Sequence, residues 1–435
     1  MPFEPNPTPP RRIVVIGGGI SGMAAAHLLA GQHHVTLIEA APRLGGHART
    51  VLAGKRGDQP VDTGFIVFNK VNYPHLTRLF DALDVPVTES NMSFGASIDG
   101  GRFEYALRNL NTVFAQKWRL ADPRLWRMLR DILRFNAKGL ATAEAGQNMT
   151  IGEMLTALGT GEWFRDYYIT PLSGAIWSTP TRGILDFPAT AMMRFFDNHA
   201  LLQTSGQHQW YTVRGGSVEY VRRLSARLQV EGVEIRLGAP VTGLKRDALG
   251  AEIRSAGGEW ERFDEVVLAT HADTSLALLS DATPAETAAL SKVRYQPNKM
   301  TLHADPRVMP KRRSAWASWI YSEMPGHARD RIDLTYWMNS LQPIPQDDPL
   351  FVTLNGNRPL DEALIYNETE FRHPVYDLGT LAGQQEVRSL NGQNATWFCG
   401  AWMRSGFHED GFASAVDVVD ALAARSLTAR TPVSP

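Results

Sequence analysis

The chain has 435 residues, of which 43% are hydrophobic and 20% are charged, and this composition excludes wholesale disorder and suits two domains. Its 44 basic and 45 acidic residues give a formal net charge of -1, so no overall field attracts nucleic acid and we expect no nucleic-acid partner. The single cysteine, Cys399, excludes an internal disulfide and a cysteine-cluster metal site, and it fits a reducing, cytoplasmic compartment.

The N-terminal part predicts a strand, a glycine turn, a helix and a second strand. Residues 1–11 are rich in proline, and we expect them to be flexible. The apolar run Ile13–Ala30 follows two arginines and resembles a targeting segment, but its glycines would weaken a membrane helix. The strand-like run Val35–Glu39 follows at once. We therefore predict a βαβ unit here, and no membrane span elsewhere, because no other stretch approaches about 18 unbroken apolar residues.

The glycine turn has the spacing Gly17-x-Gly19-x-x-Gly22, directly after the first strand. Only glycine tolerates such a tight turn, lets backbone N–H groups approach a pyrophosphate, and lets the helix pack closely on the strand. Glu39 ends the second strand, where a carboxylate can accept hydrogen bonds from an adenosine ribose. This context favours dinucleotide binding at the helix N-terminus over a plain glycine turn.

The later elements are of two kinds. Helical patterns occupy residues 74–85 and dominate between about 108 and 200. Gly215–Ser217 opens an amphipathic helix that runs to Leu228. The remaining predicted elements are strands at 233–237 and 266–269, alternating antiparallel strands at 297–305 and 350–354, a strand at 396–399, a turn with glycines at 400, 406 and 411, and a helix from 412 to about 424.

Two features favour FAD over NAD as the dinucleotide. The segment Arg43–Thr50 holds a second glycine pair, Gly45-Gly46, which lets the chain wrap the far side of the pyrophosphate, while its arginines supply charged donors. The C-terminal turn Gly400–Phe412 directs a helix N-terminus at an electron-rich group, and this dipole stabilises an anionic reduced flavin by up to about 2 kcal/mol.

Because the two kinds of segment interleave, we predict two discontinuous domains in a fold of the α/β (α+β) class. The first is a Rossmann-type FAD-binding domain made of residues 12–85, 205–290 and 390–425. The second is a substrate domain of antiparallel sheet plus helices, made of residues 86–204 and 291–389. Residues 1–11 and 426–435 are predicted to be flexible termini.

The motifs resemble those of the FAD-dependent amine oxidase, protoporphyrinogen oxidase and carotenoid desaturase superfamily, and the resemblance runs nearly end to end. The residues that carry it are Gly17–Gly22, Glu39, Arg43–Gly46, Asp62–Gly64 and Gly400–Phe412. Further stretches are similar to one branch, the bacterial flavoproteins associated with cyclopropane-fatty-acid synthase-like methyltransferases. These stretches are VDTGFIVFN (61–69), SGAIWSTP (173–180), WYTVRGGS (210–217), VRYQPNKMTLHAD (293–305) and GFHEDG (406–411).

The resemblance implies a set of residues that contact non-covalent FAD. They are Gly17, Gly19, Ile20, Ser21, Gly22, Glu39, Ala40, Arg43, Gly45, Gly46, His47, Thr63, Gly64, Phe65, Val241, Ala269, Thr270, Gly400, Gly411 and Phe412. One departure is His47, which replaces an arginine common in the superfamily, so that Arg43 or Arg49 would compensate the phosphate charge.

The candidate catalytic residues are Lys299, which the resemblance implies, and His408 and Glu409, which belong to a polar cluster capable of acid/base chemistry. Lys299 matches a lysine that reaches the flavin through a water in many amine oxidases, but an exposed strand lysine is the alternative. The cluster His408–Asp410 either contacts flavin or substrate, or caps and packs the final helix. Phe412 falls where amine oxidases place one wall of an aromatic cage, although a cage for a cation favours tyrosine. We expect no metal, since adjacent residues rarely converge on one ion.

The segment 122–138 predicts a basic amphipathic helix. Its cations are Arg127, Arg130, Arg134 and Lys138, and its apolar residues are Leu125, Trp126, Leu129, Ile132 and Leu133. Such a helix either packs on the substrate domain with a solvated basic face, or makes a transient contact with the inner face of a membrane.

Together these features predict an FAD-dependent oxidoreductase. The branch resemblance implies that it desaturates a methylated or unsaturated fatty-acyl chain of a lipid, or another apolar small molecule, with oxygen or quinone as electron acceptor. An amine oxidase that releases hydrogen peroxide is the first alternative. A non-redox isomerase or binding protein with the flavin fold is the second, because a fold does not determine a substrate.

Overall fold

The computed structural model describes residues 9–146, 148–203, 206–247, 249–325 and 331–428. Most of the two termini predicted to be flexible, residues 1–8 and 429–435, lie outside the described residues. The final helix extends to Thr428, three residues past the predicted end of the FAD-binding domain.

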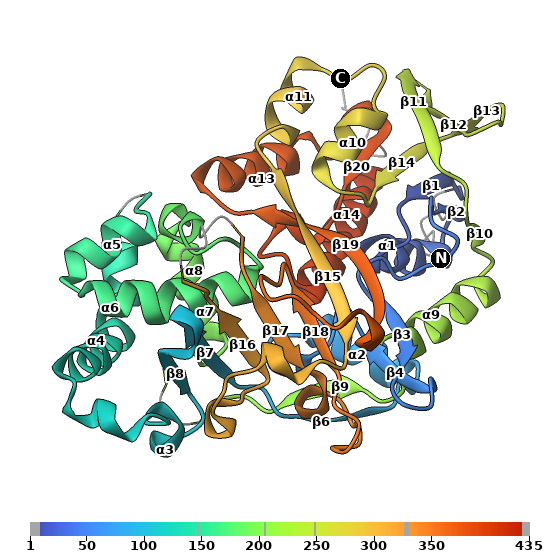
Figure 1. Cartoon of the computed structure of the whole chain (residues 1–435). Helices are drawn as coiled ribbons and strands as arrows, with labels where there is room; N and C mark the ends of the chain where they lie inside the picture. The colour runs from blue at the N-terminus through green and yellow to red at the C-terminus, as the bar shows by residue number, and fades with distance from the viewer. Residues whose placement is uncertain (1–8, 147, 204–205, 248, 326–330, 429–435) are drawn as a thin grey trace, which may run out of the picture.

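A five-stranded parallel sheet carries the N-terminal glycine turn, and its strand order is β10-β2-β1-β14-β20 (Figure 1). The strands are β1 (Arg12–Ile16), β2 (His34–Ile38), β10 (Glu234–Arg236), β14 (Glu265–Leu268) and β20 (Thr396–Phe398). They come from the beginning, the middle and the end of the chain. The sheet is covered on both faces, which explains why β1 reads as an unbroken apolar run.

Alternate residues of β1 pack into two separate hydrophobic cores, one on each face of the sheet. Ile13 and Val15 face a core made with α1 (Ile20–Ala30), α2 (Pro74–Ala82), α9 (Val218–Val230) and α14 (His408–Thr428). Val14 and Ile16 face a second core on the other side. Its elements are the sheet of β11 (Val241–Asp247), β12 (Gly250–Ser255) and β13 (Trp260–Phe263), with α10 (Ala272–Leu278), α11 (Pro284–Leu290) and α13 (Leu378–Leu390).

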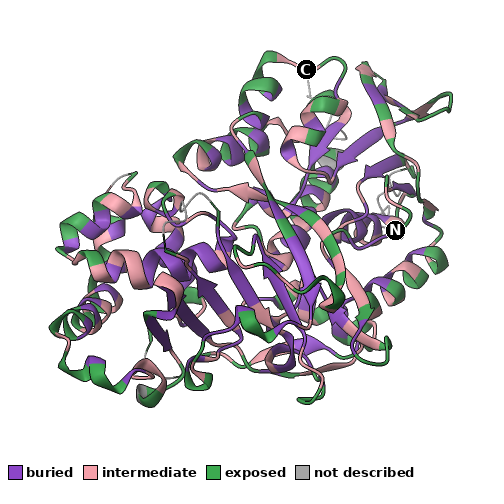
Figure 2. Ribbon diagram, viewed as in Figure 1, coloured by how far each residue is buried: buried purple, intermediate pink, exposed green. Residues whose placement is uncertain are grey.

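A seven-stranded sheet of order β19-β15-β18-β17-β16-β7-β8 forms the centre of the molecule (Figure 1). Its strands are β7 (Phe94–Ile98), β8 (Phe103–Ala106), β15 (Arg294–His303), β16 (Trp319–Ser322), β17 (Leu334–Trp337), β18 (Phe351–Leu354) and β19 (Ile365–Val375). Its neighbours are antiparallel except for the parallel pair β16–β7. Figure 2 shows that the central strands are largely buried.

Helices from residues 110–198 pack against this sheet and share its largest core. They are α3 (Leu110–Val113), α4 (Pro123–Ala145), α5 (Ile151–Leu158), α6 (Glu162–Phe164), α7 (Thr170–Trp177) and α8 (Ala189–Asn198), while α12 (Met338–Leu341) follows β17. Short strands complete the fold as two small sheets. These are β3 (Thr50–Ala53) with β4 (Gln59–Asp62), and β5 (Phe68–Asn69) with β9 (Trp210–Val213) and β6 (Val87–Ser90).

The structure confirms a mixed α/β fold in which a parallel sheet and a largely antiparallel sheet interleave along the chain. Within the described residues, no helix is both long and apolar enough to span a bilayer. The domain boundaries stay a prediction. One element begins earlier than predicted: α14 starts at His408 rather than Phe412, because Asp410 Oδ2 accepts a hydrogen bond from Phe407 N (2.9 Å) and so caps this earlier start.

Candidate active site

Three glycine-containing segments, from both ends of the chain, meet at the N-terminus of α1. A β-carbon built on Gly411 would lie 2.8 Å from Ile20 Cγ2 and 2.8 Å from Ser21 Oγ. A β-carbon on Gly46 would lie 3.1 Å from Gly19 Cα. Gly45 N also donates to Gly18 O (2.8 Å). The two turns that the sequence predicts to share one ligand therefore lie against each other.

This meeting point leaves the first turn of α1 open for an anion. Gly19 is the N-cap residue, and among the described residues no side chain caps the helix and no acidic residue lies in its first turn. A β-carbon on Gly19 would meet no described atom within 4 Å, although Ile20–Gly22 are buried. A buried helix N-terminus with free N–H groups is a binding site for phosphate. The arrangement therefore fits the pyrophosphate of a dinucleotide.

Glu39 marks the adenosine end of the predicted groove. Its carboxylate accepts hydrogen bonds from Gly18 N (2.6 Å) and Ala41 N (2.7 Å), so it lies directly beside the glycine turn. The chain that leads to Val241 runs alongside, because Ala239 N donates to Glu39 O (3.0 Å). Ala40 is exposed between them. These contacts place Glu39, Ala40 and Val241 in one region, as the predicted site requires.

The ends of two further strands border the same turn. A β-carbon on Gly17 would lie 2.7 Å from Ala269 O and 3.2 Å from Thr270 Cγ2. Trp402 Nε1 donates to Thr270 O (3.0 Å), and Gly400 N donates to Ser414 Oγ (2.9 Å) within the C-terminal turn. The strand ends after β14 and β20 thus join the N-terminal turn at the carboxyl edge of the parallel sheet, where open α/β sheets bind ligands.

Arg43 shapes the second glycine loop from within. Its guanidinium donates to three backbone carbonyls, those of Leu44, Gly46 and Ala48, at 2.9–3.2 Å. Burial lowers the pKa of the Arg43 guanidinium. Arg49 donates to Thr63 Oγ1 (3.3 Å), and burial likewise lowers the pKa of its guanidinium. Both arginines stay close to the loop that would wrap the phosphates.

Gly64 brings the next segment against this loop. Phe65 N donates to His47 O (2.9 Å), and a β-carbon on Gly64 would lie only 2.0 Å from the same oxygen. The Phe65 ring stacks on the His408 imidazole at 3.9 Å, and His408 Nε2 forms a hydrogen bond with Tyr220 Oη at 2.6 Å. The close approach at Gly64 therefore places the Phe65 ring against His408, at the start of α14.

Uncharged histidines gather beside Phe65. The His47 ring contacts the rings of Phe371 (4.7 Å), His373 (5.5 Å) and His271 (6.1 Å). Burial lowers the pKa of His373 and of His271 to about 4 and that of His408 to about 3, and it lowers the pKa of His47 well below its usual value. No three His, Cys, Asp or Glu side chains of the described residues are arranged to hold a metal ion.

Asn298 connects this histidine cluster to the helical layer. Its Nδ2 atom donates to His373 Nδ1 (2.9 Å), which requires that nitrogen to be unprotonated, and to Ser178 O (3.4 Å). Gln296 Nε2 donates to the same carbonyl at 2.6 Å. Ser178 has a φ of 51°, a strained value for a serine, and these amide donors help to hold it.

Lys299 points away from the cluster, which corrects its predicted role. Neighbouring strand residues project to opposite faces, so Lys299 lies on the other face of β15 from Asn298. Its ammonium pairs with Glu368 Oε1 at 2.7 Å, and its side chain is 59% exposed. The exposed strand lysine, which was the alternative interpretation, is the one that the structure favours.

Glu409 and Phe412 have structural contacts in place of their predicted site roles. The two Glu409 oxygens accept hydrogen bonds from His75 N and Leu76 N (both 2.9 Å), so this carboxylate caps α2. The Phe412 ring is buried in the core below the sheet and stacks on His75 at 5.6 Å. Glu409 is therefore a cap rather than a free acid, and Phe412 is not available as a cage wall.

Sequence reasoning missed the residues that hold the site together. Asp62 is fully buried and accepts hydrogen bonds from Ser217 N, Ser217 Oγ, Thr50 Oγ1 and Gln342 Nε2, at 2.6–3.0 Å. Asn298 and Gln296 were missed as well, although the alternation of a strand at 294–303 places both on one face. Tyr220, the partner of His408, could not be identified from a local pattern, because its position in the sequence is that of an ordinary core residue of α9.

The histidine cluster predicts a loss of stability in acid. His373 has a folded pKa of about 4, below the ordinary value near 6.5, so the folded state binds the proton less well than the unfolded state. Its contribution is complete above about pH 6.5 and is lost as the pH falls toward 4. In the wild type, the unfolding free energy should fall as the pH falls. We expect His373→Gln to make this dependence on pH shallower by about 1.4 kcal/mol per pH unit between about pH 6 and pH 5.

Urea unfolding at several pH values measures this slope. His34→Gln is the control, because His34 is exposed. An unchanged slope in His373→Gln, with the stability at neutral pH preserved, would show that His373 is not buried as an uncharged group.

Comparison with known proteins now adds to this geometry. A family model described as flavin containing amine oxidoreductase matches residues 20–416. Hydroxyneurosporene desaturase from Rubrivivax gelatinosus is 25% identical over 343 residues, which cover 68% of this chain and 60% of that protein. An L-amino-acid oxidase from Sistrurus catenatus edwardsii matches over 42 residues, 8% of its own length, so the chain spans less than two thirds of these curated relatives.

Solved structures share the fold over nearly the whole chain. The fatty acid isomerase from P. acnes that produces CLA has a TM-score of 0.66 at 16% identity, covering 94% of this chain and 98% of that one. Cyclohexylamine oxidase from Brevibacterium oxydans IH-35A has a TM-score of 0.66 at 16% identity, covering 95% of this chain and 100% of that one. At such identities the likeness concerns the fold alone.

Proposed function

The chain belongs to the flavin containing amine oxidoreductase family, and from this we propose that it is an FAD-dependent oxidoreductase that desaturates a methylated or unsaturated fatty-acyl chain of a lipid. One observation carries the proposal: the glycine segments that leave the α1 N-terminus open lie next to a cluster of half-buried, uncharged histidines. The electron acceptor that we propose is oxygen or a quinone.

The chain's own groups would hold the cofactor as follows. The free N–H groups of the first turn of α1 would hold the pyrophosphate, the guanidinium of Arg43 would hold the shape of the neighbouring glycine loop, and Glu39 would accept from the adenosine ribose. We propose that FAD is held without a covalent bond. Cys399 is fully buried, with its thiol pKa raised to about 12, and His408 Nε2 is already bonded to Tyr220.

When bound, FAD supplies an acceptor for a hydride and its two electrons. The protein supplies a dry, apolar surrounding. Trp177 packs on Phe195 (4.9 Å), and Phe407, the residue before His408, packs on the same ring at 4.8 Å. Asn298 fixes the tautomer and orientation of His373. Loss of hydride from an isolated methylene would leave an unstabilised cation, so the substrate carbon must be allylic or lie beside a heteroatom.

The charges of the site favour an acyl chain over an amine. An ammonium ion needs a carboxylate or an electron-rich aromatic cage. Glu409 is occupied as a cap and Phe412 lies in the core, while the neighbouring histidines are neutral. The desaturase relative acts, by its name, on hydroxyneurosporene, and 68% of this chain aligns with it. These observations support an uncharged, apolar substrate.

Anaerobic flavin reduction tests the proposal. The purified FAD protein is mixed with phospholipids that carry methyl-branched, monounsaturated acyl chains, and separately with a panel of primary amines. We expect bleaching of the flavin by the lipids and a new double bond in the acyl chain. Bleaching with amines alone, followed by peroxide release once oxygen is admitted, would make it an amine oxidase, and double-bond migration without net oxidation would make it an isomerase. A protein without FAD would contradict every redox assignment.

Asn298 and Lys299 give a sharp pair of variants for the same assay. We expect Asn298→Ala to slow flavin reduction roughly tenfold or more, because it frees the His373 ring and the Ser178 carbonyl that it holds. Lys299→Met is expected to keep the rate within about twofold, since its side chain lies on the other face of the strand. The ratio of bound FAD to protein is the control for folding. A larger loss of the flavin reduction rate in Lys299→Met than in Asn298→Ala would show that Lys299, and not Asn298, acts at the site.

A further inference from the structure

Exposed apolar side chains concentrate on one edge of the helical layer, at the segment 117–138. Four of the large hydrophobic residues with high exposure lie there, namely Trp118 (61%), Leu120 (48%), Trp126 (51%) and Leu133 (59%). The amphipathic pattern predicted Trp126 and Leu133 on the same apolar face as Leu125. The structure corrects this, because the packed side of α4 is Leu125, Met128, Asp131 and Phe135, and residues 126, 130, 133 and 137 form the opposite face.

The same edge carries positive charge without exposed negative charge. The exposed cations of the segment are Lys117, Arg124, Arg127, Arg130 and Lys138. Its two acidic side chains are turned inward, since Asp122 is 8% exposed and paired with Arg119 and Arg124, and Asp131 is 2% exposed. This surface therefore combines indoles, leucines and cations, whereas the whole chain has a formal net charge of -1.

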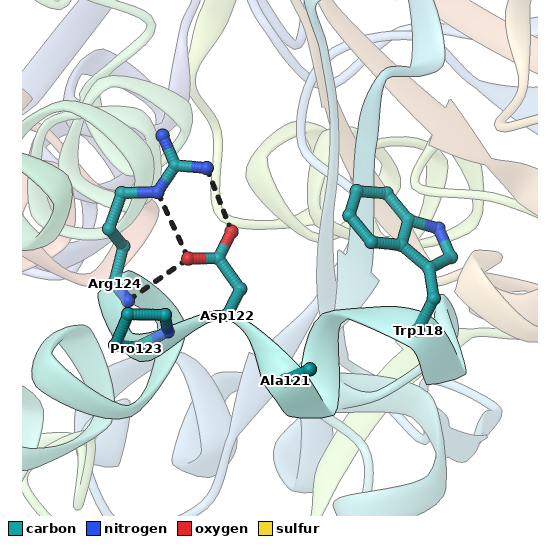
Figure 3. Close-up of a pocket in the computed structure, with 5 residues that line it drawn as sticks. All are labelled: Trp118, Ala121, Asp122, Pro123 and Arg124. Atoms are coloured by element: carbon teal, nitrogen blue, oxygen red, sulfur yellow. Dashed lines mark hydrogen bonds and ion pairs between the residues drawn. The ribbon is translucent and has the colours of Figure 1, made fainter.

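Internal contacts present these side chains in a fixed arrangement. Trp126 Nε1 donates to Leu120 O (2.8 Å), and its ring contacts Phe114 at 5.5 Å. Figure 3 shows Trp118 and the Asp122–Arg124 pair rising from the same side of the ribbon. These residues line an open pocket of about 380 Å³. One side of the Trp118 ring is therefore open to solvent, with space for a group from outside the protein.

We propose that this edge, the segment 117–138, docks on the surface of an anionic phospholipid membrane. Exposed indoles and leucines enter the interfacial region of a bilayer, and arginine and lysine beside them attract anionic headgroups. A second copy of the chain fits less well, because a two-fold contact would place the same cations opposite each other. The described helices contain no membrane span, so the protein would lie on the surface. This inference does not depend on the substrate.

Vesicle flotation of the purified FAD protein tests the inference, using phosphatidylcholine vesicles with and without phosphatidylglycerol. We expect flotation with the anionic vesicles only, weakened by salt. Trp118→Ala with Leu133→Ala, and separately Arg127→Gln with Lys138→Gln, should each lower the partition coefficient roughly tenfold. The matched control is Leu52→Ala with Arg56→Gln, since Leu52 is 64% exposed and the Arg56 side chain 83% exposed, on the β3–β4 hairpin.

Three results would overturn the proposal. In the first, the wild-type protein stays out of the floating fraction with both vesicles. In the second, the control pair lowers binding as much as the docking pairs. In the third, the wild type forms a dimer that Trp118→Ala with Leu133→Ala abolishes, which would identify a second copy as the occupant. Bound FAD and an unchanged melting temperature show that each variant is folded.

Discussion

Gly22→Ala should yield a protein that binds FAD far more weakly and loses much of it on purification. A β-carbon at this position would lie 1.7 Å from Gly17 O and 3.0 Å from Gly17 C, both backbone atoms that cannot rotate away. The helix must therefore shift from the strand, which changes the N–H groups that would face the phosphates. Overpacking costs about 1–3 kcal/mol and occasionally more, and the upper part of this range applies where the clash is with rigid backbone. We expect roughly hundredfold weaker FAD binding together with a lower melting temperature.

Gly31→Ala is the matched control for this variant, at the other end of the same helix. Gly31 has a helical φ of -71°, and a β-carbon there would meet nothing within 4 Å. Its FAD content and melting temperature should equal those of the wild type. FAD is measured from its absorbance relative to protein, before and after release by heat. A yellow Gly22→Ala protein with normal stability would show that the close helix–strand contact is not needed for the cofactor.

Asp62→Ala should cause the largest loss of stability among the polar substitutions considered. Asp62 is fully buried and accepts hydrogen bonds from Thr50, Ser217 and Gln342, so its removal leaves several buried donors without a partner. Such losses in a buried network are about 3–5 kcal/mol. Because Ser217 precedes α9 and Gln342 follows α12, the effect should extend to both parts of the molecule.

Urea unfolding, followed by circular dichroism and by release of FAD, measures this loss. Asp58→Ala is the control, because the Asp58 side chain is 62% exposed and its ion pair with Arg56 lies on the surface, where such a pair has little energetic value. We expect the control to change the unfolding free energy by less than about 0.5 kcal/mol. If Asp62→Ala lowered the unfolding free energy by less than about 1 kcal/mol, the donors of Thr50, Ser217 and Gln342 would have found other hydrogen-bond acceptors.

The parts of the site that the sequence could predict are those governed by local sterics. Gly17, Gly22 and Glu39 belong to one βαβ unit, where close approach and strand length determine the residue types. The second loop at Gly45-Gly46 was predictable for the same reason, because a positive φ favours glycine. The C-terminal turn was predicted to share this ligand from its glycines and the helix that follows it, and the structure shows its proximity directly at Gly411.

The parts that could not be predicted depend on partners far away in the sequence. Glu409 looked like a catalytic acid because its cap partners, His75 and Leu76, lie 334 and 333 residues away. Lys299 and Asn298 are adjacent, and choosing between them required the exact register of β15 against β19, where Asn298 is opposite Phe371. A shift of one residue in a strand reverses the face, and composition does not determine that register.

The closure of the groove by α14 has a consequence for biosynthesis. Gly411 lies on Ile20 and Ser21, so one wall of the cofactor cradle is translated about 390 residues after the other. A nascent chain on the ribosome has the first wall and the intervening sheets, but not the helix that completes them. We therefore expect cofactor loading to be a late event, because a chain that stops before His408 lacks this wall of the cradle.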